Sequence, residues 1–385
     1  MKYDVYTMEE ALDEIIDYRG KTPQKVDKGG VPTLSAKAIK NNCIDYELCY
    51  CISLDEYKRF MTRGMPKIGD VLLTTEAPLG MVARLDRDDI AIAQRLLTLR
   101  GKAGILDNEY LFYYLQSPRG QAALRARETG TTVTGIKQSE FRKMQIYIPS
   151  IENQRKIGKI LGDIDRKITI NKEINKNLSN LLQTIYQKRF GEVSLGAKQG
   201  ILSDICSYSK EKVAVSELNV NTYFSTENML PEKAGSTKAT SLPTTPQTTA
   251  CRKGDTLISN IRPYFKKIVY CEDMCGCSTD VLCFTPVQSQ YAAYLFSTLY
   301  TDKFFAFMVA GSKGTKMPRG DKQQIMTYPV VVPAESELEE FNAIAFPVLE
   351  QLNSNKAENK RLSALRDALL PKLMSGEIDI SAIDL

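Results

Sequence analysis

The most constraining feature of this chain is an eleven-residue segment that occurs twice. Residues 171–181 read NKEINKNLSNL and residues 355–365 read NKAENKRLSAL, with seven of the eleven positions identical at a constant offset of 184 residues. Such an internal repeat constrains the fold strongly, because each copy marks one supersecondary unit of a repeated architecture. The chain is therefore predicted to be a tandem duplication.

Each copy lies within a longer pattern in which apolar residues, with two asparagines at mid-length, recur at alternating steps of four and three. This spacing is typical of a coiled-coil seam. One long helix cannot bury such a seam alone, so we expect the two copies to pair as an antiparallel coiled coil. The predicted seam residues are Ile157, Leu161, Ile164, Ile168, Asn171, Asn175, Leu178, Leu182 and Ile185 in the first helix, and Val348, Leu352, Asn355, Asn359, Leu362 and Leu369 in the second.

Charge and side-chain chemistry support this pairing. Residues 151–190 contain nine Lys and Arg against four Asp and Glu, whereas residues 334–376 contain five against seven. Opposite net charges favour the two helices pairing with each other over self-pairing. The four asparagines have an alternative place on an exposed face, but their position on the apolar stripe favours burial, where amides pair and fix the register. Pro347 interrupts the second pattern, so we expect a break or kink near Phe346.

Each predicted helix follows a globular segment, and the two segments resemble one another. KIGDVLLTT (67–75) and IAIAQRLLTLR (90–100) are predicted as buried strands, and KGDTLIS (253–259) echoes the first of them. LDEIIDYRGKTP (12–23) is predicted as a short helix ending in a turn, 108 to about 127 as a longer helix, 130–135 as a loop and 144–149 as an edge strand. Tyr-Leu-Phe at 110–112 recurs at 294–296, Gly130-Thr131 recurs at Gly314-Thr315, and Pro149 recurs at Pro333, all at the offset of 184.

The predicted fold class is α+β, as a tandem duplication of a mixed α/β domain followed by a long helix. The first domain covers 1–150, its helix 151–190 and a linker 191–200. The second domain covers 201–333, its helix 334–376 and a carboxyl-terminal tail 377–385. Within the second domain, 231–250 is rich in Ser, Thr and Pro and is predicted as a loop without a counterpart in the first.

Composition narrows the class of protein. The chain has 385 residues, enough for two domains and a connector, with ordinary hydrophobic (43%) and charged (25%) contents. It contains no apolar run of transmembrane length and no signal-like amino terminus, so we expect a cytoplasmic protein. It has no histidine, which removes the commonest general base. Its nine cysteines lack zinc-finger spacing, and we expect reduced, mostly buried thiols rather than a metal site; four thiolates binding zinc is the alternative.

The ordered combination of these motifs resembles the specificity subunit of type I restriction–modification systems, over nearly the whole chain. The similarity rests on IPSIENQRKIGKILGDIDRKI (148–168), IYQKRF (185–190), LLPKLMSGEIDI (369–380), and the GKTP, GDVLLT and AQRLLTLR motifs with a Gly-Thr loop before each final strand. The second helix opening, VPAESELEEFNAIAFPVL, departs from the family pattern because it lacks the usual glutamine.

The resemblance implies a non-catalytic DNA-reading protein without cofactors, belonging to an adenine methyltransferase and endonuclease complex. Each globular segment would be a target recognition domain for one half of a split sequence in double-stranded DNA. Two methyltransferase subunits would dock on the helices, and restriction/translocase subunits would join for cleavage. No membrane partner is implied.

Two loops are candidates for DNA contact, because glycines let backbone amides approach phosphates while hydroxyl and cationic side chains supply donors. Their alternative is an ordinary surface loop between a helix and a strand, and we favour contact. GSKGTK (311–316) lacks phosphate-loop spacing, so nucleotide binding is not expected. The candidate residues are Gly130, Thr131, Thr132, Lys137 and Gln138 in the first half, and Ser312, Lys313, Thr315, Lys316 and Arg319 in the second.

The segments that follow the two Gly-Asp strands are a second candidate. Asn, Arg and Lys are the side chains that read purine edges in the major groove. A solvated hairpin is the alternative, and NIRPYFKK (260–267) makes the second half the stronger case. The candidate residues are Thr74, Thr75, Glu76 and Arg84 in the first half, and Ser259, Asn260, Arg262, Tyr264, Lys266 and Lys267 in the second.

Two rival functions remain open from the residues alone. The first is a stand-alone DNA methyltransferase or nuclease, but the chain has no adjacent prolines, no GxGxxG after a strand and no evident carboxylate–lysine cluster. The second is a purely structural coiled-coil adaptor. A methylation assay on the isolated chain and a DNA shift assay with and without a methyltransferase partner would separate the three.

Overall fold

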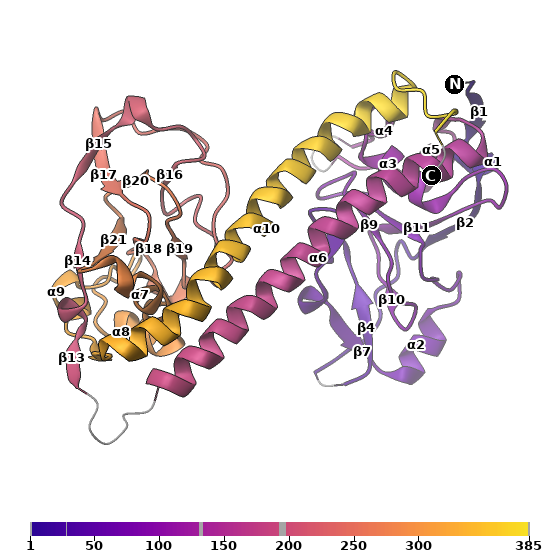
Figure 1. Ribbon diagram of the computed structural model, residues 1–385. Helices are drawn as coiled ribbons and strands as arrows, with labels where there is room; N and C mark the ends of the chain where they lie inside the picture. Colours follow the sequence, from indigo (N-terminus) through magenta and orange to yellow (C-terminus); the bar gives the residue numbers. More distant parts are fainter. Residues whose placement is uncertain (1, 28, 131–133, 192–197, 384–385) are drawn as a thin grey trace. The chain divides into compact units, whose positions relative to one another are not determined.

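The protein is described by a computed structural model covering residues 2–27, 29–130, 134–191 and 198–383. Its contacts divide the chain into two compact units, unit 1 (1–169 with 359–385) and unit 2 (170–358). The chain contains two long helices, α6 (Ile151–Phe190) and α10 (Glu335–Ser375), which Figure 1 labels. Part of each helix belongs to unit 1 and the rest to unit 2. The residues outside the described ranges include most of the predicted linker 191–200.

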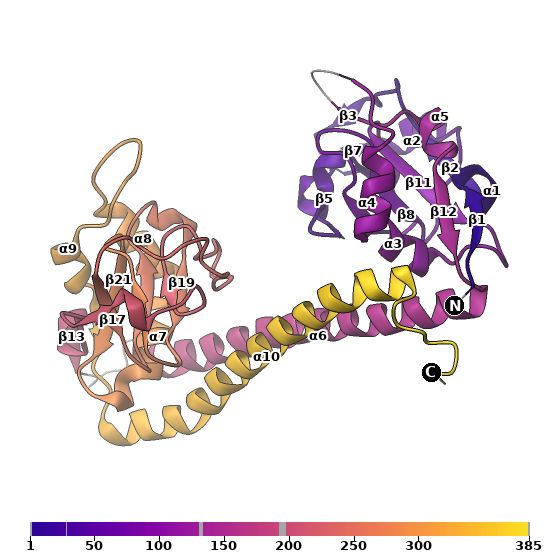
Figure 2. The same ribbon diagram turned by 90° about the horizontal axis from the view of Figure 1, so that it is seen from above.

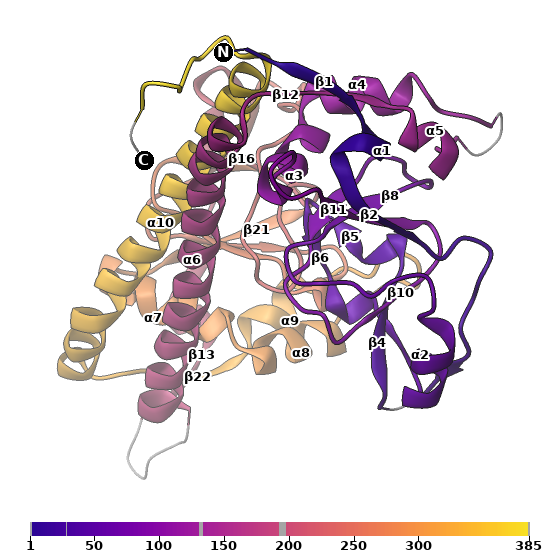
Figure 3. The ribbon, with the colours of Figure 1, turned by 90° about the vertical axis from the view of Figure 1, so that its right-hand side faces the viewer.

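Unit 1 is built on an antiparallel sheet with the strand order β2-β11-β8-β9. Its strands are β2 (Leu12–Asp17), β11 (Leu96–Gly101), β8 (Val71–Thr74) and β9 (Val82–Arg84). A second sheet has the order β10-β4-β7-β3, from β10 (Ala91–Ile92), β4 (Val31–Leu34), β7 (Tyr50–Ile52) and β3 (Lys25–Val26). Two short ladders complete the unit: β1 (Asp4–Thr7) with β12 (Gln145–Ile148), which lie side by side in Figure 3, and β5 (Ile39–Lys40) with β6 (Cys43–Ile44).

The helices of unit 1 lie between and around these strands. They are α1 (Met8–Ala11), α2 (Leu54–Phe60), α3 (Asn108–Gln116), α4 (Pro118–Arg125) and α5 (Gln138–Arg142), with short 3₁₀ turns η1 (Ala36–Ala38) and η2 (Tyr46–Leu48). One apolar core joins β8 and β11 to α3 and to the long helices, because Val71, Leu97, Tyr110, Leu161 and Leu373 all belong to it. The long helices are thus part of the core of the unit and not a separate stalk.

Unit 2 repeats the main sheet of unit 1. Its strand order is β14-β21-β18-β19, from β14 (Cys206–Tyr208), β21 (Val281–Pro286), β18 (Thr256–Ser259) and β19 (Ile268–Tyr270). The counterpart in unit 2 of the β1–β12 ladder is the ladder of β13 (Gln199–Ile201) with β22 (Pro329–Val331). The other sheet has the order β15-β17-β20-β16, from β15 (Lys212–Ala214), β17 (Gln247–Cys251), β20 (Cys275–Cys277) and β16 (Tyr223–Phe224).

The helices of unit 2 are α7 (Ala292–Leu299), α8 (Asp302–Ala310) and α9 (Lys322–Met326), with 3₁₀ turns η3 (Leu202–Asp204), η4 (Val215–Glu217), η5 (Pro263–Phe265) and η6 (Ser289–Tyr291). Equivalent residues make equivalent bonds in the two units. Tyr110 of α3 donates its hydroxyl to the Tyr147 carbonyl at 3.3 Å, and Tyr294 of α7 donates to the Val331 carbonyl at 2.5 Å. Both residues of each pair are related by the offset of 184, so the duplication holds at the level of single contacts.

The long helices run antiparallel within each unit. In unit 1, Arg366 Nη1 pairs with Asp165 Oδ1 at 2.7 Å, and Asn359 Nδ2 donates to the Ile168 carbonyl at 3.4 Å. In unit 2, Asn355 Nδ2 donates to Asn175 Oδ1 at 2.8 Å. In both units higher residue numbers on α6 face lower numbers on α10, which is the antiparallel coiled-coil pairing.

The predicted seam residues take different positions along the pair. Ile157, Leu161, Ile168, Asn171, Leu182, Val348, Leu352 and Asn355 are buried, whereas Ile164, Asn175, Leu178, Ile185, Asn359, Leu362 and Leu369 are half-buried. Unit 2 supplements the seam with aromatic packing, because Tyr186 and Phe190 of α6 contact Phe341 of α10 with ring centroids 6.4 and 5.5 Å apart.

Several local predictions were wrong. Residues 12–17 form strand β2 instead of a helix, because pairing with β11 buries Ile16 in the core and overrides the local helical pattern. The helix predicted over 108–127 is two helices: Ser117 ends α3, and its Oγ caps α4 by accepting the Gly120 N–H at 3.1 Å with Pro118 at the first turn. The run 90–100 is two strands separated by a turn at Arg95, whose φ is +72°.

The helix α10 runs without a break through Pro347, so the expected break near Phe346 is absent, although the helix curves along its first half (Figure 2). Proline at position 347 cannot donate to the carbonyl of Ala343. Ala343 and Pro347 are both exposed, which leaves that carbonyl open to water and lowers the cost of the missing bond.

Candidate nucleic-acid interface

The two candidate segments of unit 1 meet where strand β8 of the main sheet ends. Thr129 and Gly135 exchange two backbone hydrogen bonds, at 2.8 and 3.1 Å, and so close the loop at its base. The Ile136 N–H donates to the Thr75 carbonyl at 2.9 Å, and Glu76 forms a β-bridge with Gly135. The glycine–threonine loop is therefore anchored directly to the chain that leaves β8.

Unit 2 builds the same junction at the equivalent place. Lys313 and Arg319 exchange two backbone hydrogen bonds, at 2.9 and 3.0 Å, and these residues are Thr129 and Gly135 displaced by 184. The Arg262 N–H donates to the Pro318 carbonyl at 2.8 Å, and Ile261 forms a β-bridge with Arg319. In both units the structure brings together two candidate segments that are separated by about 50 residues in the sequence.

An ion pair lies at each junction. In unit 1, Arg95 Nε lies 2.6 Å from Glu76 Oε1, and in unit 2, Arg319 Nη2 lies 3.1 Å from Asp280 Oδ1. Arg95 and Asp280 both stand just before the central strand of their sheet and were not predicted as site residues. A signal for Arg95 was present in the AQRLLTLR motif, but the run was interpreted as one buried strand.

The remaining candidates of unit 1 divide into three groups. Thr131 and Thr132 lie outside the described residues. Gly130 has a φ of +106°, which favours glycine at this point of the loop, and Lys137 beside it is exposed. Thr75 is buried, and Gln138 donates to the Ile15 carbonyl at 3.3 Å, so both hold the junction together.

Arg84 lies away from this junction. It pairs with Val71, at the opposite end of β8 from Thr74, and its Nη1 contacts Glu109 Oε1 of α3 at 2.8 Å. The structure therefore does not bring Arg84 to the surface formed by the loop.

In unit 2 the segment after β18 is tightly held. Asn260 is 6% exposed, and neither its Oδ1 nor the Nε of Arg262 has a hydrogen-bond partner within the described chain. Arg262 and Lys266 both have positive φ, +50° and +51°, and between them the short turn η5 exposes Tyr264 and Phe265. An exposed aromatic pair flanked by basic residues is a stacking surface typical of nucleic-acid contacts.

The two lysines of this segment already have partners. Lys266 Nζ lies 3.0 Å from Asp302 Oδ1, and Lys267 Nζ donates to the Thr226 carbonyl at 2.5 Å. Lys233 shares the same carboxylate at 2.8 Å, and the two ammonium groups hold the pKa of Asp302 below its usual range. Lys266, at the end of η5, is thus joined to α8 through Asp302.

The loop of unit 2 carries three exposed cations, Lys313, Lys316 and Arg319. Lys313 Nζ contacts Asp321 Oδ2 at 2.7 Å, and this ion pair lowers the pKa of the Asp321 carboxyl. Ser312 Oγ donates to the Val309 carbonyl at 2.7 Å and ends helix α8. Lys313, Thr315, Lys316 and Arg319 are exposed, so the loop presents hydroxyl and cationic groups around Gly314, whose φ is +102°.

The cysteines are free thiols. Six of the nine are buried, and five of these, Cys251, Cys271, Cys275, Cys277 and Cys283, lie in one small core of unit 2. Cys271 Sγ and Cys275 Sγ are 3.6 Å apart. Over the described ranges, no three or more Cys, Asp or Glu side chains are arranged to hold a metal ion.

The described helices include none that is long and apolar enough to cross a membrane.

Comparison with known proteins finds similarity to one family. A family model described as the type I restriction modification DNA specificity domain matches residues 7–180. The type I restriction enzyme MjaIX specificity subunit of Methanocaldococcus jannaschii is 23% identical over 413 aligned residues, which cover 94% of this chain and 91% of that protein. The MjaVIII specificity subunit of the same organism is 32% identical over 101 residues, covering 25% of this chain and 23% of that protein.

A solved structure has the same fold. The S subunit of a type I restriction–modification system from M. genitalium aligns with a TM-score of 0.60 and 17% identity, covering 97% of this chain and 96% of that one. Residues 7–180 are thus similar to the type I restriction modification DNA specificity domain, and nearly the whole chain is similar to a type I restriction enzyme specificity subunit.

Proposed function

We propose that the chain reads a bipartite sequence in double-stranded DNA, each half through one target recognition domain, 1–150 or 201–333. The observation that carries this proposal is the loop junction built twice. Thr129–Gly135 and Lys313–Arg319 close equivalent loops on equivalent strand ends at an offset of 184 residues. A duplicated recognition surface on a duplicated fold is what two half-sites require.

The candidate side chains fall into an exposed group, which could contact DNA directly, and a buried group, which could not. Lys137 in unit 1 and Lys313, Lys316 and Arg319 in unit 2 are exposed cations suited to phosphate or base edges. Tyr264 offers a ring face beside them. Thr75 and Asn260 are buried, and their role in the proposal is to fix the position of the loops. The exposed side chains, and not the buried ones, would determine which bases are recognised.

The repeated segment of the long helices supports two identical partners. Lys172 and Lys176 of α6 are exposed, and so are their counterparts Lys356 and Lys360 of α10. A surface presented twice suits two copies of one protein. In the proposal these partners are two methyltransferase subunits, restriction/translocase subunits join the same complex for cleavage, and the complex works on DNA in the cytoplasm.

The test is DNA binding by the chain assembled with its methyltransferase partner, measured over a range of salt concentrations. The double variant Lys313→Ala/Lys316→Ala removes two exposed cations from the loop of unit 2. Its matched control is Lys253→Ala. Lys253 is an exposed lysine of the same unit that precedes the first residue of β18, whereas the loop contacts the chain after the last residue of β18. Each lost phosphate contact should lower the slope of log K against log salt by about 0.9.

We expect the double variant to bind DNA at least tenfold more weakly with a shallower salt slope, and the control to bind as the wild type does. Equal affinity and equal slope in all three proteins would exclude this loop from the interface.

A further inference from the structure

A buried ion pair supports the main sheet of unit 1. Asp70, in the Gly-Asp motif before β8, is 1% exposed. Arg100 of β11 donates to its two carboxylate oxygens from Nε at 2.8 Å and from Nη2 at 2.7 Å, and the Lys67 N–H donates at 2.8 Å. The fork of the guanidinium thus satisfies and neutralises a carboxylate that has lost its water.

Unit 2 keeps the carboxylate and lacks the arginine. Asp255 follows Gly254 before β18 and accepts the Arg252 N–H at 2.8 Å, as Asp70 accepts that of Lys67. Strand register identifies the missing partner: Leu99 pairs with Val71 and Phe284 with Thr256, so the position of Arg100 is that of Thr285. A threonine cannot supply a positive charge.

The environment of Asp255 is therefore incomplete. It is 2% exposed, and Cys283 Sγ lies 3.2 Å from its Oδ2. Its hydrogen-bond donors, the Arg252 N–H and the Cys283 thiol, are neutral groups, and so is the hydroxyl of Thr285 beside it. In the part of unit 2 that the structure describes, no Lys or Arg side chain forms an ion pair with Asp255, and burial raises the pKa of its carboxyl.

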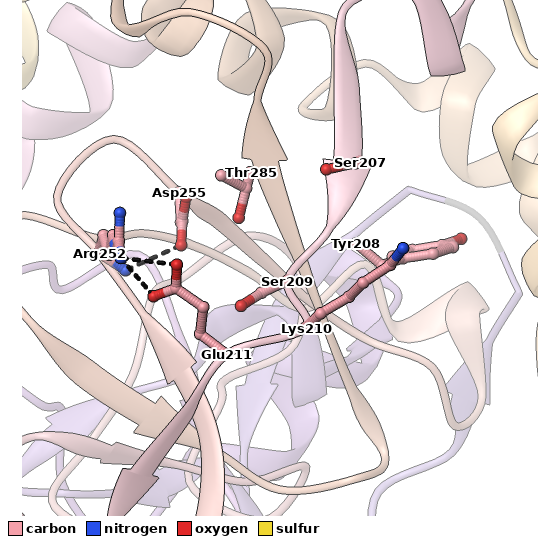
Figure 4. Close-up of a pocket in the computed structure, with 8 residues that line it drawn as sticks. All are labelled: Ser207, Tyr208, Ser209, Lys210, Glu211, Arg252, Asp255 and Thr285. Carbon is pink, nitrogen blue, oxygen red and sulfur yellow. Dashed lines mark hydrogen bonds and ion pairs between the residues drawn. The ribbon is translucent and has the colours of Figure 1, made fainter.

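A pocket of about 270 Å³ opens beside this carboxylate. Figure 4 shows Asp255 and Thr285 next to each other in its lining, with Ser209 nearby and the ammonium group of Lys210 directed away from Asp255. The guanidinium of Arg252 pairs with Glu211, at 2.5 Å between Nη2 and Oε2. Neither of the two cations that line the pocket, Lys210 and Arg252, therefore places its charged group against the Asp255 carboxylate.

We propose that this pocket binds a guanidinium group, which gives Asp255 the partner that Arg100 gives Asp70. The planar guanidinium presents forked N–H donors that match a carboxylate. Hydroxyl groups of Ser207, Ser209 and Thr285 line the pocket as further acceptors. Two sources share this chemistry, an arginine side chain of another protein and a small free guanidino compound.

The proposal is tested on the full chain by ligand-observed NMR titration with methylguanidinium. Thr285→Arg places a tethered guanidinium in the pocket, Asp255→Asn removes the charge, and Lys253→Ala is the matched control outside the pocket. We expect saturable binding to the wild type and the control, and at least a tenfold loss of affinity in Asp255→Asn and Thr285→Arg. Affinity should also fall as the pH is lowered toward protonation of Asp255.

A second pair of ligands separates the two sources. Binding of arginine blocked as its N-acetyl amide shows that a side chain within a protein fits, whereas binding of free L-arginine but not the blocked form assigns the pocket to a small compound. The proposal is overturned when the wild type shows no saturable binding, or when Asp255→Asn, with unchanged circular dichroism, binds methylguanidinium as the wild type does.

Discussion

Asn355 of α10 donates from Nδ2 to Oδ1 of Asn175 of α6 at 2.8 Å, and Asn175 donates in turn to the Leu352 carbonyl at 3.2 Å. The pair joins the first asparagine of one copy of the repeat to the second asparagine of the other. Asn171 Nδ2 contacts Glu358 Oε2 at 2.7 Å nearby. Paired amides in an otherwise apolar seam fix which residues face each other, because any slip leaves them unpaired.

Removing one member of this pair should destabilise the protein. Asn355→Ala leaves the half-buried Oδ1 of Asn175 without its donor, and the loss of one such hydrogen bond costs about 0.5–1.5 kcal/mol. The double variant Asn175→Leu/Asn355→Leu should recover most of that loss, since both polar groups are gone. Urea unfolding measures the effect, with Asn177→Ala, an exposed asparagine of α6, as the control. A single variant as stable as the control would show that the pair does not contribute.

The buried ion pair of unit 1 should be far more sensitive than the ion pair at its loop. Arg100→Met leaves the Asp70 carboxylate buried without a cation, which costs about 3–5 kcal/mol. Arg95→Ala removes the exposed arginine that contacts Glu76 and should cost no more than about 1 kcal/mol. Comparable losses in the two variants, measured by thermal unfolding, would contradict this ranking.

Asp255 gives a pH dependence of defined sign. Burial raises the pKa of its carboxyl in the folded chain, so protonation favours folding. Its favourable contribution is present below the usual aspartate pKa of about 3.9 and is lost as the pH rises through the folded pKa. In guanidinium-free buffer, Asp255→Asn should therefore be more stable than the wild type at pH 8, and the difference should shrink toward pH 4.

Urea midpoints between pH 4 and 8 measure this, with Asp70→Asn as the comparison. Asp70 is paired with Arg100, so its variant should be less stable than the wild type at pH 8. Loss of stability in Asp255→Asn at pH 8 would show that its carboxylate already has sufficient partners.

The repeat allowed the long helices and the Gly-Asp strands to be predicted, because heptad spacing and internal identity are local properties of the sequence. The strand at 12–17 was missed because its identity depends on pairing with β11, about 80 residues away. The division at Ser117 is predictable from the Ser-Pro pair, because serine caps a helix and proline is favoured in its first turn. The meeting of the loop with Thr75 could not be predicted, since it depends on the path of the chain through the sheet and not on spacing.

The helix pair is expected to set the gap between the half-sites. Inserting one turn into both α6 and α10 lengthens each helix by about 5–6 Å. At about 3.4 Å per base pair, the gap should grow by one or two base pairs while each half-site stays unchanged. Methylation mapping in cells that carry the lengthened chain with its partners measures the gap. An altered half-site at constant gap would show that the helices do not act as the ruler.

The most direct test of the duplicated recognition surface is methylation mapping with a hybrid chain. Residues 4–149, which carry the loop junction of unit 1, replace residues 198–333, so that both junctions are the same. Wild type and hybrid are each expressed with the methyltransferase partner, and methylated sequences are mapped across the genome. We expect a bipartite wild-type target with two different half-sites, and a hybrid target that repeats the first half-site in inverted orientation across a similar gap. A hybrid that still methylates the second half-site of the wild type, or a wild-type target without two separated parts, would contradict this expectation.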